Sequence, residues 1–483
     1  MTIRMRDYLL LYINGKEHRL QGAEVFSPLS TWLRYEQQAI GTKVVCEEGD
    51  CGACTVLIGK VNNGEIAYRP LNSCIQYLYQ LDCAHVVTIE GLRIDGNLNP
   101  VQLSMVEHHG AQCGYCTPGF IVAMCALFDC QKTATEQEIK DALTGNLCRC
   151  TGYEPIIKAG QNVAVDRVIK LNDIYPPAEM LKAFRTHEQN PVQIRADGKI
   201  CAVPVDVKGA VEFKASHPGT VIVSGGTDVC VNCNKKGFDP DIVMSLSNVV
   251  GLENLKIAND VLIVGGKVTL LALEEYTRDL VPQLYEMMWL FGSPQIRNAG
   301  TLAGNIANAS PIADTLPFLF VMEAQVELTG SQGARRVNIN NFYKGYKQTD
   351  LAQDELITGI FIPIPQPDES LRLFKVSKRK NLDISTFTAA VRIKKSPGGK
   401  IDSARLAYGG VAPVVLRLPR TEAFLLGKDF NLEVFQEAGR LAREEITPIS
   451  DVRGSADFRF QLAENIMSKF FYEVSSEREL ACR

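Results

Sequence analysis

Residues 46–56, CEEGDCGACTV, place three cysteines in one glycine-rich loop, and a fourth follows downstream: Cys46, Cys51, Cys54 and Cys74. The order C-x4-C-x2-C with a distant fourth cysteine is typical of a loop that wraps a 2Fe-2S cluster. Gly49 and Gly52 permit a positive φ, which turns backbone N–H groups toward the cluster sulfurs. A zinc site also takes four thiolates, but zinc sites favour paired C-x2-C motifs, and this set does not pair.

A second set of four cysteines lies in QCGYCTPGF and TGNLCRCTGY: Cys113, Cys116, Cys148 and Cys150. The first pair precedes a predicted helix and the second pair follows one, so four thiolates can converge from two helix ends. Read alone, this set is open to zinc or to 2Fe-2S. The presence of the first set favours 2Fe-2S.

The bulk composition excludes several classes of protein. The net charge of -4 gives no electrostatic reason to bind nucleic acid. The longest apolar run, Ile121 to Phe128, is far shorter than the roughly 20 residues of a membrane span. The N-terminal residues lack a cleavage site and predict a first strand. Fifteen cysteines then indicate thiol ligands in a reducing compartment, and we expect a cytoplasmic location.

The chain is long enough for several domains. Residues 8–92 alternate short β-rich runs with turns and predict a small mixed sheet with one helix near Ser30–Gln38. Residues 93–171 predict four helices, and Thr135 with Glu138 forms a capping box at the start of the third. The four predicted helices span residues 105–112, 119–128, 135–143 and 153–169.

The second half of the chain begins after Pro176 and Pro177, which lie in a polar segment, 172–195, that we predict to be a linker. Residues 196–372 alternate strands with helix-like stretches, an α+β pattern. Residues 373–483 contain three strands followed by two helix-like runs.

Two glycine-rich stretches lie in the α+β region, VIVSGGTDV at 221–229 and GTLAGNIANASPIADTLP at 300–317. Both can offer backbone amides to a pyrophosphate. Neither has the form G-x-G-x-x-G, so a Rossmann dinucleotide site is unsupported. Cys230 and Cys233, just after the first stretch, form a C-x2-C that we interpret as structural.

The two cysteine signatures, in this order over residues 8–165, resemble the iron-sulfur modules of the molybdenum hydroxylase family. The two glycine-rich stretches resemble the FAD-binding domain of xanthine dehydrogenases and related members. The resemblance implies an α+β multidomain fold with four parts. They are a β-grasp ferredoxin-like domain (1–92), a four-helix 2Fe-2S domain (93–171), a non-Rossmann α+β FAD-binding domain (196–372) and a C-terminal α/β flavoprotein domain (373–483).

The resemblance also implies roles for residues around FAD. Two groups would hold the pyrophosphate from opposite sides: Ser224, Gly225, Gly226, Thr227 and Asp228, and then Gly300, Thr301, Gly304 and Asn305. Asp314 would bind ribityl or ribose hydroxyls, and Phe291 would lie against the flavin. Lys378 would belong to the unit that closes over the cofactor. Family members often have a lysine a few residues further on, where this chain has Ser385.

By the same resemblance, this chain is an electron-transfer component without catalytic residues of its own. Electrons would pass from a molybdenum centre in a larger molybdopterin-binding subunit, through the second and then the first 2Fe-2S cluster, to FAD and NAD. Gln112 would contact the pterin and Cys150 would be the entry atom. The reaction would be oxidation of hypoxanthine and xanthine to urate, in a heterotetramer of two small and two large chains.

Two other functions stay open. The same role could serve a hydroxylase that acts on an aldehyde, nicotinate or another heterocycle, since the substrate binds the partner chain. A protein of a different class, a zinc-binding scaffold without redox function, would use the same cysteines.

Overall fold

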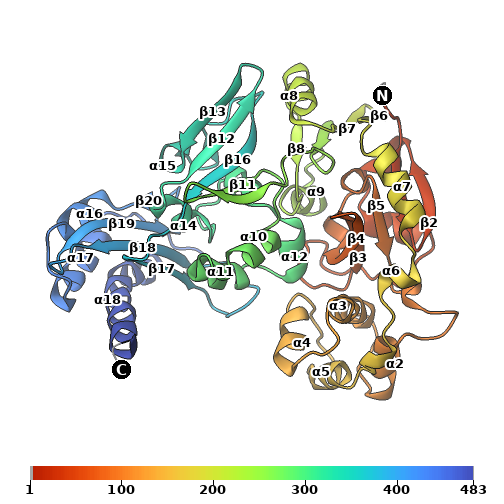
Figure 1. Ribbon diagram of the computed structural model, residues 1–483, viewed down its shortest axis with the longest axis horizontal. Coiled ribbons are helices and arrows are strands. Elements are labelled where there is room, and N and C mark those ends of the chain that lie inside the picture. Colours follow the sequence, from red (N-terminus) through yellow and green to blue (C-terminus); the bar gives the residue numbers. More distant parts are fainter. Residues whose placement is uncertain (1–3, 482–483) are drawn as a thin grey trace. The chain divides into compact units, whose positions relative to one another are not determined.

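The computed structural model describes residues 4–481 and divides the chain into two units (Figure 1). Unit 1 comprises Met1–Gly251 and Gly292–Gly300, and unit 2 comprises Leu252–Phe291 and Thr301–Arg483. The segment predicted as one FAD-binding domain, 196–372, therefore contributes to both units. The first residues of the predicted N-terminal strand and the last two residues of the chain lie outside the described residues.

Unit 1 begins with a five-stranded sheet of order β2-β1-β5-β3-β4, in which β1 is antiparallel to β2 and parallel to β5. The strands are β1 (Leu9–Ile13), β2 (Lys16–Leu20), β3 (Thr55–Asn62), β4 (Glu65–Asn72) and β5 (Ala84–Val87), and the predicted helix is α1 (Leu29–Tyr35). Every residue of β1 is buried because alternate side chains enter different cores. Leu9 and Leu11 pack with Trp32, whereas Leu10 and Tyr12 pack with the helical domain.

The helical domain has the four predicted helices, with shifted ends: α2 (Pro100–Glu107), α3 (Thr117–Cys130), α4 (Glu136–Ala142) and α5 (Glu154–Gln161). The capping box of Thr135 and Glu138 is confirmed. Helix α2 starts earlier than predicted because the Asn99 side chain accepts from the Gln102 N–H. It also ends earlier, and His109 just beyond has a positive φ of 53°.

The segment predicted as a linker, 172–195, is largely ordered structure. It begins within α6 (Leu171–Ile174), contains α7 (Ala178–His187) and leads into β6 (Val192–Ala196). Phe184 is fully buried, and its ring meets the Tyr12 ring edge-on with centroids 5.6 Å apart. Met180 and Phe184 are four residues apart, so one face of α7 covers the sheet.

The rest of unit 1 is a four-stranded sheet of order β6-β7-β9-β8, in which β7, β9 and β8 run parallel. Its other elements are β7 (Lys199–Val203), β8 (Val221–Val223), β9 (Ile242–Ser245), α8 (Val207–Ser216) and α9 (Val229–Lys236). Val223, Cys230 and Val243 share one core with the ferredoxin-like sheet. Helix α12 (Pro294–Ala299) packs on β4.

Unit 2 combines two larger antiparallel sheets, of order β10-β11-β16-β12-β13 and β17-β18-β19-β20, with a small hairpin of β14 (Tyr343–Gly345) and β15 (Gln348–Thr349). The strands are β10 (Leu255–Ala258), β11 (Val261–Gly265), β12 (Gln325–Gly330), β13 (Gly333–Asn338), β16 (Leu356–Pro363), β17 (Glu369–Val376), β18 (Phe387–Lys395), β19 (Ile401–Gly409) and β20 (Leu416–Arg417). The main helices are α10 (Leu270–Thr277), α11 (Pro282–Trp289), α13 (Leu302–Asn308), α14 (Leu316–Val321), α16 (Pro419–Leu425), α17 (Leu432–Glu444) and α18 (Ala456–Ala481). None of the described helices is long and apolar enough to cross a membrane.

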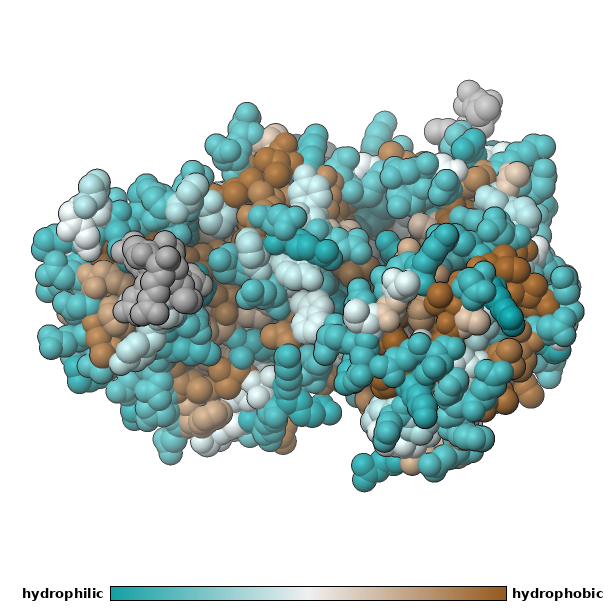
Figure 2. All heavy atoms as spheres, turned by 60° about the horizontal axis from the view of Figure 1, so that its bottom comes forward, coloured by the Kyte–Doolittle hydropathy of each residue, from teal (hydrophilic) through white to brown (hydrophobic). Residues whose placement is uncertain are grey.

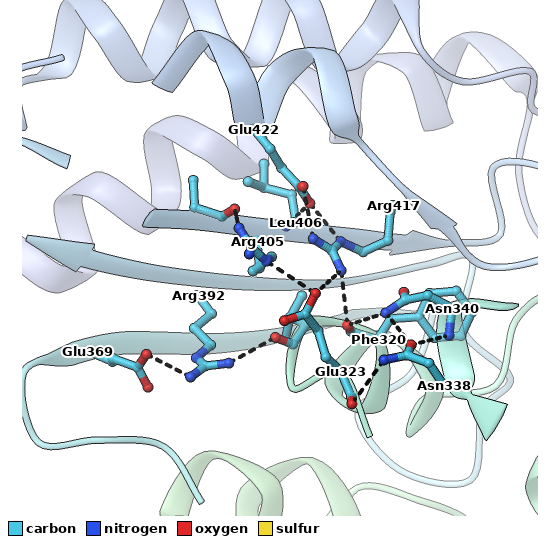
Figure 3. Close-up of polar contacts among 12 residues, drawn as sticks. Phe320, Glu323, Asn338, Asn340, Glu369, Arg392, Arg405, Leu406, Arg417 and Glu422 are labelled. Atoms are coloured by element: carbon cyan, nitrogen blue, oxygen red, sulfur yellow. Dashed lines mark hydrogen bonds and ion pairs between the residues drawn. The ribbon is translucent and has the colours of Figure 1, made fainter. Parts of the chain in front are cut away.

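The end of α14 is fastened to the C-terminal sheet by arginines (Figure 3). Arg417 donates to the Phe320 carbonyl at 3.3 Å and Arg392 donates to the Val321 carbonyl at 3.2 Å. Glu323 lies 3.4 Å from Arg405 and 3.6 Å from Arg417. Cations at the carboxyl end of a helix are favourable because unpaired carbonyls gather negative charge there.

Candidate functional site

The first cysteine set converges on one side of the ferredoxin-like sheet. The Sγ atoms of Cys54 and Cys74 are 3.2 Å apart. Hydrogen bonds from Cys51 and then Cys74 hold the pKa of Cys46 far below its usual range, so these sulfurs also lie within reach of one another. Gly49 and Gly52 have φ of +76° and +68°, which confirms the predicted positive φ at both positions.

Polar side chains fix the loop that carries this set. Asn72 Nδ2 donates to the Gly49 carbonyl at 2.7 Å, and Thr55 Oγ1 donates to the Gly52 carbonyl at 2.6 Å. Ser73 Oγ donates to the Cys54 carbonyl at 2.7 Å. These three carbonyls are thus paired with side chains, which fixes the backbone that carries the cysteines.

The second cysteine set forms two pairs, before α3 and after α4 as the sequence predicts. Cys113 Sγ and Cys150 Sγ are 3.7 Å apart, and both residues are exposed. Burial, and then a hydrogen bond with Cys148, raises the pKa of Cys116 to about 12. Gln112, predicted to contact a pterin, is exposed beside Cys113.

The two sets are joined by backbone. The Leu147 N–H donates to the Cys51 carbonyl at 3.0 Å, and Leu147 directly precedes Cys148. Asn146 Nδ2 donates to the Gly52 carbonyl at 3.0 Å. A Cβ at Gly119 would lie 2.2 Å from the Gly52 carbonyl oxygen, so only glycine allows this close approach.

In the described part of the chain, no group of three or more His, Cys, Asp or Glu side chains has the arrangement of a metal-ion site. The assignment of the eight cysteines as cluster ligands therefore stays a prediction, supported by the pairwise convergence of their sulfurs.

The first glycine-rich stretch forms a tight loop between β8 and α9 in unit 1. A Cβ at Gly225 would lie 2.0 Å from the Ala299 carbonyl oxygen and 2.8 Å from Gly300 Cα, so this loop packs closely against Ala299 and Gly300 of the same unit. Gly226 has a φ of +72°. The Ser224 hydroxyl is buried and has no hydrogen-bond partner among the described residues. A buried, unpaired hydroxyl in a glycine-lined turn fits a polar ligand such as the pyrophosphate of FAD.

The second glycine-rich stretch opens α13 in unit 2. Thr301 Oγ1 accepts from the Gly304 N–H at 3.0 Å and caps the helix. Asn305 Oδ1 accepts from Thr315 Oγ1 at 2.6 Å. Phe291 is partly buried against the core of this unit, and its contact with the flavin stays a prediction.

Asp314 is held at both carboxylate oxygens. Lys375 Nζ lies 2.5 Å from Oδ2, and Ser385 Oγ donates to Oδ1 at 2.5 Å. Asp314 and Lys375 are almost fully buried. Lys378, the predicted basic contact, is exposed and donates to the Val452 carbonyl at 2.8 Å.

Lys375 is the residue that sequence reasoning missed. Its signal was the two-residue period of β17, in which Leu371 and Leu373 face the core of unit 2. Lys375 continues that face, so a lysine there is buried unless it is paired. Cys230 of the C-x2-C after the first loop is buried in the core of unit 1, and the structural interpretation of this motif stays a prediction.

Four domain models match consecutive parts of the chain. They are a 2Fe-2S iron-sulfur cluster binding domain (11–78), a 2Fe-2S binding domain (88–161), the FAD binding domain in molybdopterin dehydrogenase (193–365) and the CO dehydrogenase flavoprotein C-terminal domain (372–474). They confirm the predicted α+β multidomain fold class. With the relatives below, they identify the chain as a 2Fe-2S and FAD protein of the molybdenum hydroxylase family.

Among curated relatives, xanthine dehydrogenase 1 of Arabidopsis thaliana is 29% identical over 544 residues, covering 96% of this chain and 40% of the relative. The chain thus spans about two fifths of the length of such relatives. Among solved structures, quinoline 2-oxidoreductase from Pseudomonas putida 86 is 27% identical with a TM-score of 0.53, over 57% of this chain and 96% of the other. Carbon monoxide dehydrogenase from Hydrogenophaga pseudoflava is 26% identical with a TM-score of 0.53, over 56% and 94%.

Proposed function

We propose that this chain is the electron-transfer subunit of a xanthine dehydrogenase. It takes electrons from a molybdenum centre in a larger molybdopterin-binding partner and passes them through its 2Fe-2S clusters to FAD and then NAD, as hypoxanthine and xanthine are oxidised to urate. The clusters carry single electrons, and flavin converts these to the two-electron hydride that NAD accepts.

The observation that carries the proposal is the hydrogen bond from the Leu147 N–H to the Cys51 carbonyl. Cys51 belongs to the first set, and Leu147 is bonded to Cys148 of the second set. A short bonded path between two predicted clusters is what a one-electron relay needs. The 2Fe-2S domain matches also favour iron-sulfur clusters over zinc.

The surface around the second set suits the partner. Cys113 and Cys150 are exposed, and Tyr115, Leu147 and Val106 expose apolar side chains in the same domain. Figure 2 shows apolar areas between hydrophilic side chains on the face turned toward the viewer. Exposed apolar side chains beside a redox centre favour a docking surface. We place the molybdenum-bearing partner here, in an assembly of two small and two large chains in the cytoplasm.

The test is to purify the native complex, add xanthine without oxygen and follow flavin and iron-sulfur absorbance, then supply NAD. We expect bleaching with xanthine and NADH formation with NAD. Bleaching by dithionite but not by xanthine would exclude xanthine as the substrate while keeping the relay.

Cys150 provides a sharper test of the entry point. We expect Cys150→Ser to stop flavin reduction by substrate, while NADH still reduces the flavin. Cys130→Ser is the matched control because Cys130 is an exposed thiol of the same domain outside both sets. Equal loss of both reactions in Cys150→Ser would contradict the assignment.

A second candidate is the same role in a hydroxylase with another substrate. The solved structures named above, a quinoline oxidoreductase and a carbon monoxide dehydrogenase, favour this candidate. Offering the complex an aldehyde, nicotinate, quinoline and carbon monoxide beside xanthine, with flavin bleaching as the readout, distinguishes the two.

A further inference from the structure

A single side chain connects α9 to both parts of the first cysteine set. Asn234 Nδ2 donates to the Glu47 carbonyl and to the Cys74 carbonyl, each at 2.8 Å. Its Oδ1 accepts from the Tyr77 hydroxyl at 3.0 Å. The side-chain amide thus uses both donors and its acceptor. Cys74 is a predicted ligand, and Glu47 follows the ligand Cys46 with a φ of 57°.

Gln80 makes the reciprocal connection, from the ferredoxin-like domain to the glycine loop. Its Nε2 donates to the Gly225 carbonyl at 3.2 Å, and its Oε1 accepts from the Tyr77 N–H at 2.9 Å. Gln80 is buried, and a Cβ at Gly226 would lie 2.6 Å from its Nε2. The predicted pyrophosphate loop therefore rests directly on this amide.

The two contacts run in opposite directions between the same two segments. Residues 74–80 lead from a cysteine of the first set to Gln80, and residues 225–234 lead from the glycine loop to Asn234. The Tyr77 hydroxyl donates to Asn234 and the Tyr77 N–H donates to Gln80. The backbone of the two segments and these neutral hydrogen bonds therefore form a closed ring. Loss of Asn234 or Gln80 leaves the part-buried carbonyl of Cys74 or of Gly225 without its side-chain donor, which costs more than the bond itself contributes.

We infer that Asn234 and Gln80 are positioning residues that couple the state of the N-terminal cluster to occupancy of the FAD loop. The inference rests on the proposed binding of a 2Fe-2S cluster by the first cysteine set and of FAD by the glycine loop. Hydrogen bonds around cluster ligands set the potential of such clusters, so a change at Asn234 should alter that potential. Since coupling is reciprocal, FAD removal should alter the same cluster.

The test uses the full chain with its cofactors, in the native complex, and reads the electron paramagnetic resonance signals of both reduced clusters. Asn234→Leu should shift the spectrum and the midpoint potential of the N-terminal cluster and leave the second cluster unchanged. The second cluster is an internal control within each sample. Lys235→Leu, at an exposed position of the same helix, should change neither signal.

Gln80→Leu tests the other half of the ring. We expect FAD to dissociate about tenfold more readily, because roughly one buried hydrogen bond to the loop is lost. In the wild-type protein, removing FAD should shift the signal of the N-terminal cluster. In Gln80→Leu that response to FAD should disappear.

Asn234→Asp keeps the side-chain shape but replaces two donors with an acceptor, so it decides the question if Asn234→Leu does not fold. A shift of the N-terminal cluster alone supports the inference. Unchanged spectra, or equal shifts of both clusters, would overturn it. Wild-type protein lacking two 2Fe-2S signals or FAD would overturn the proposed function and this inference together, which separates the two failures.

Discussion

The two units fasten the segments around their predicted cofactor residues by different chemistry, although unit 1 also contains a buried ion pair, Arg6 with Asp82. In unit 1, side-chain amides tie the segments around the first cysteine set to one another: Gln80, Asn146, Asn234, Gln295 and Asn298. In unit 2, charged side chains do the corresponding work: Asp314, Glu323, Lys375, Arg392, Arg405 and Arg417. We call these the amide joint and the charged joint.

The difference has a physical meaning. An amide-to-carbonyl hydrogen bond carries no net charge, so its strength hardly changes with pH or salt. Such bonds suit the surroundings of a cluster whose charge changes with each electron. An ion pair is stronger when buried but depends on both partners, since removal of one leaves the other uncompensated.

The largest effect is expected at the buried pair of the charged joint. Lys375→Met leaves the Asp314 carboxylate buried without its cation, which should lower the free energy of unfolding of unit 2 by about 3–5 kcal/mol. FAD content should fall with it. Thermal unfolding and flavin absorbance measure the two effects.

Lys378→Met is the matched control because Lys378 is exposed, and it should change stability by less than about 0.5 kcal/mol. Adding Asp314→Asn to Lys375→Met should restore much of the stability, because no buried charge is left. An equal loss in both single variants would mean that the buried pair is not what stabilises this region.

Acid should lower the stability of unit 1 at a higher pH than that of unit 2, because of His85 in β5. Burial lowers the pKa of His85 to about 4. Its Nε2 accepts from the Gly15 N–H at 3.0 Å, so the ring is neutral with its proton on Nδ1, 2.7 Å from the Tyr68 hydroxyl. The folded pKa lies below the unfolded value near 6.5, so the unfolded chain binds a proton first as pH falls. The free energy of unfolding of unit 1 should therefore fall by about 3 kcal/mol between pH 6.5 and 4.

Unit 2 should lose stability only at a lower pH. The hydrogen bond from Arg335 holds the pKa of Glu355 below its usual range, so that contribution is present above about pH 4.3 and is lost as the pH falls through the folded pKa. Hydrogen exchange at pH 7, 5.5 and 4.5, followed in residues 55–87 and 356–409, measures both units. His85→Gln should remove the step in unit 1, and simultaneous loss in both units would contradict the comparison.

A smaller effect is expected in the amide joint. Asn146 donates to the Gly52 carbonyl and accepts from Gln295 Nε2 at 2.9 Å, and it is buried. Asn146→Leu should cost about 1–3 kcal/mol of stability, because these polar groups lose a partner. Asn162→Leu, at an exposed position of the same domain, should cost less than about 0.5 kcal/mol in urea unfolding. Comparable losses would show that the joint is not stabilising.

The smallest effect is that of salt. Glu323 and Arg405 are each more than one-third exposed, so their attraction is screened when the Debye length falls to about 3 Å in 1 M salt. The free energy of unfolding of unit 2 should fall by at most about 1 kcal/mol in 1 M salt. Hydrogen exchange in residues 224–228, which Gln80 of the amide joint contacts, should not respond to salt. A salt response there larger than that around α14 would reverse the comparison.

Much of the site could be predicted because it depends on spacing along the chain. The cysteine sets, the positive φ of Gly49 and Gly52, and the cap at Thr135 each need only a few neighbouring residues. Helix α7 was missed because its apolar face is short, and only contact with Tyr12 shows that the face is buried. Lys375 was missed because a lysine is unusual only at a buried position. That position becomes evident only once β17 is known to be a strand with one buried face.

The cofactor class of this protein could be inferred from the sequence, because cluster-binding loops and glycine turns are local features set by backbone geometry. The residues that connect the sites are visible only in the folded chain. Gln80 is 145 residues from Gly225, and Asn234 is 187 residues from Glu47, so no local pattern marks either contact. An amide becomes a positioning group only when folding buries it against an unpaired carbonyl, and burial is a property of the whole chain.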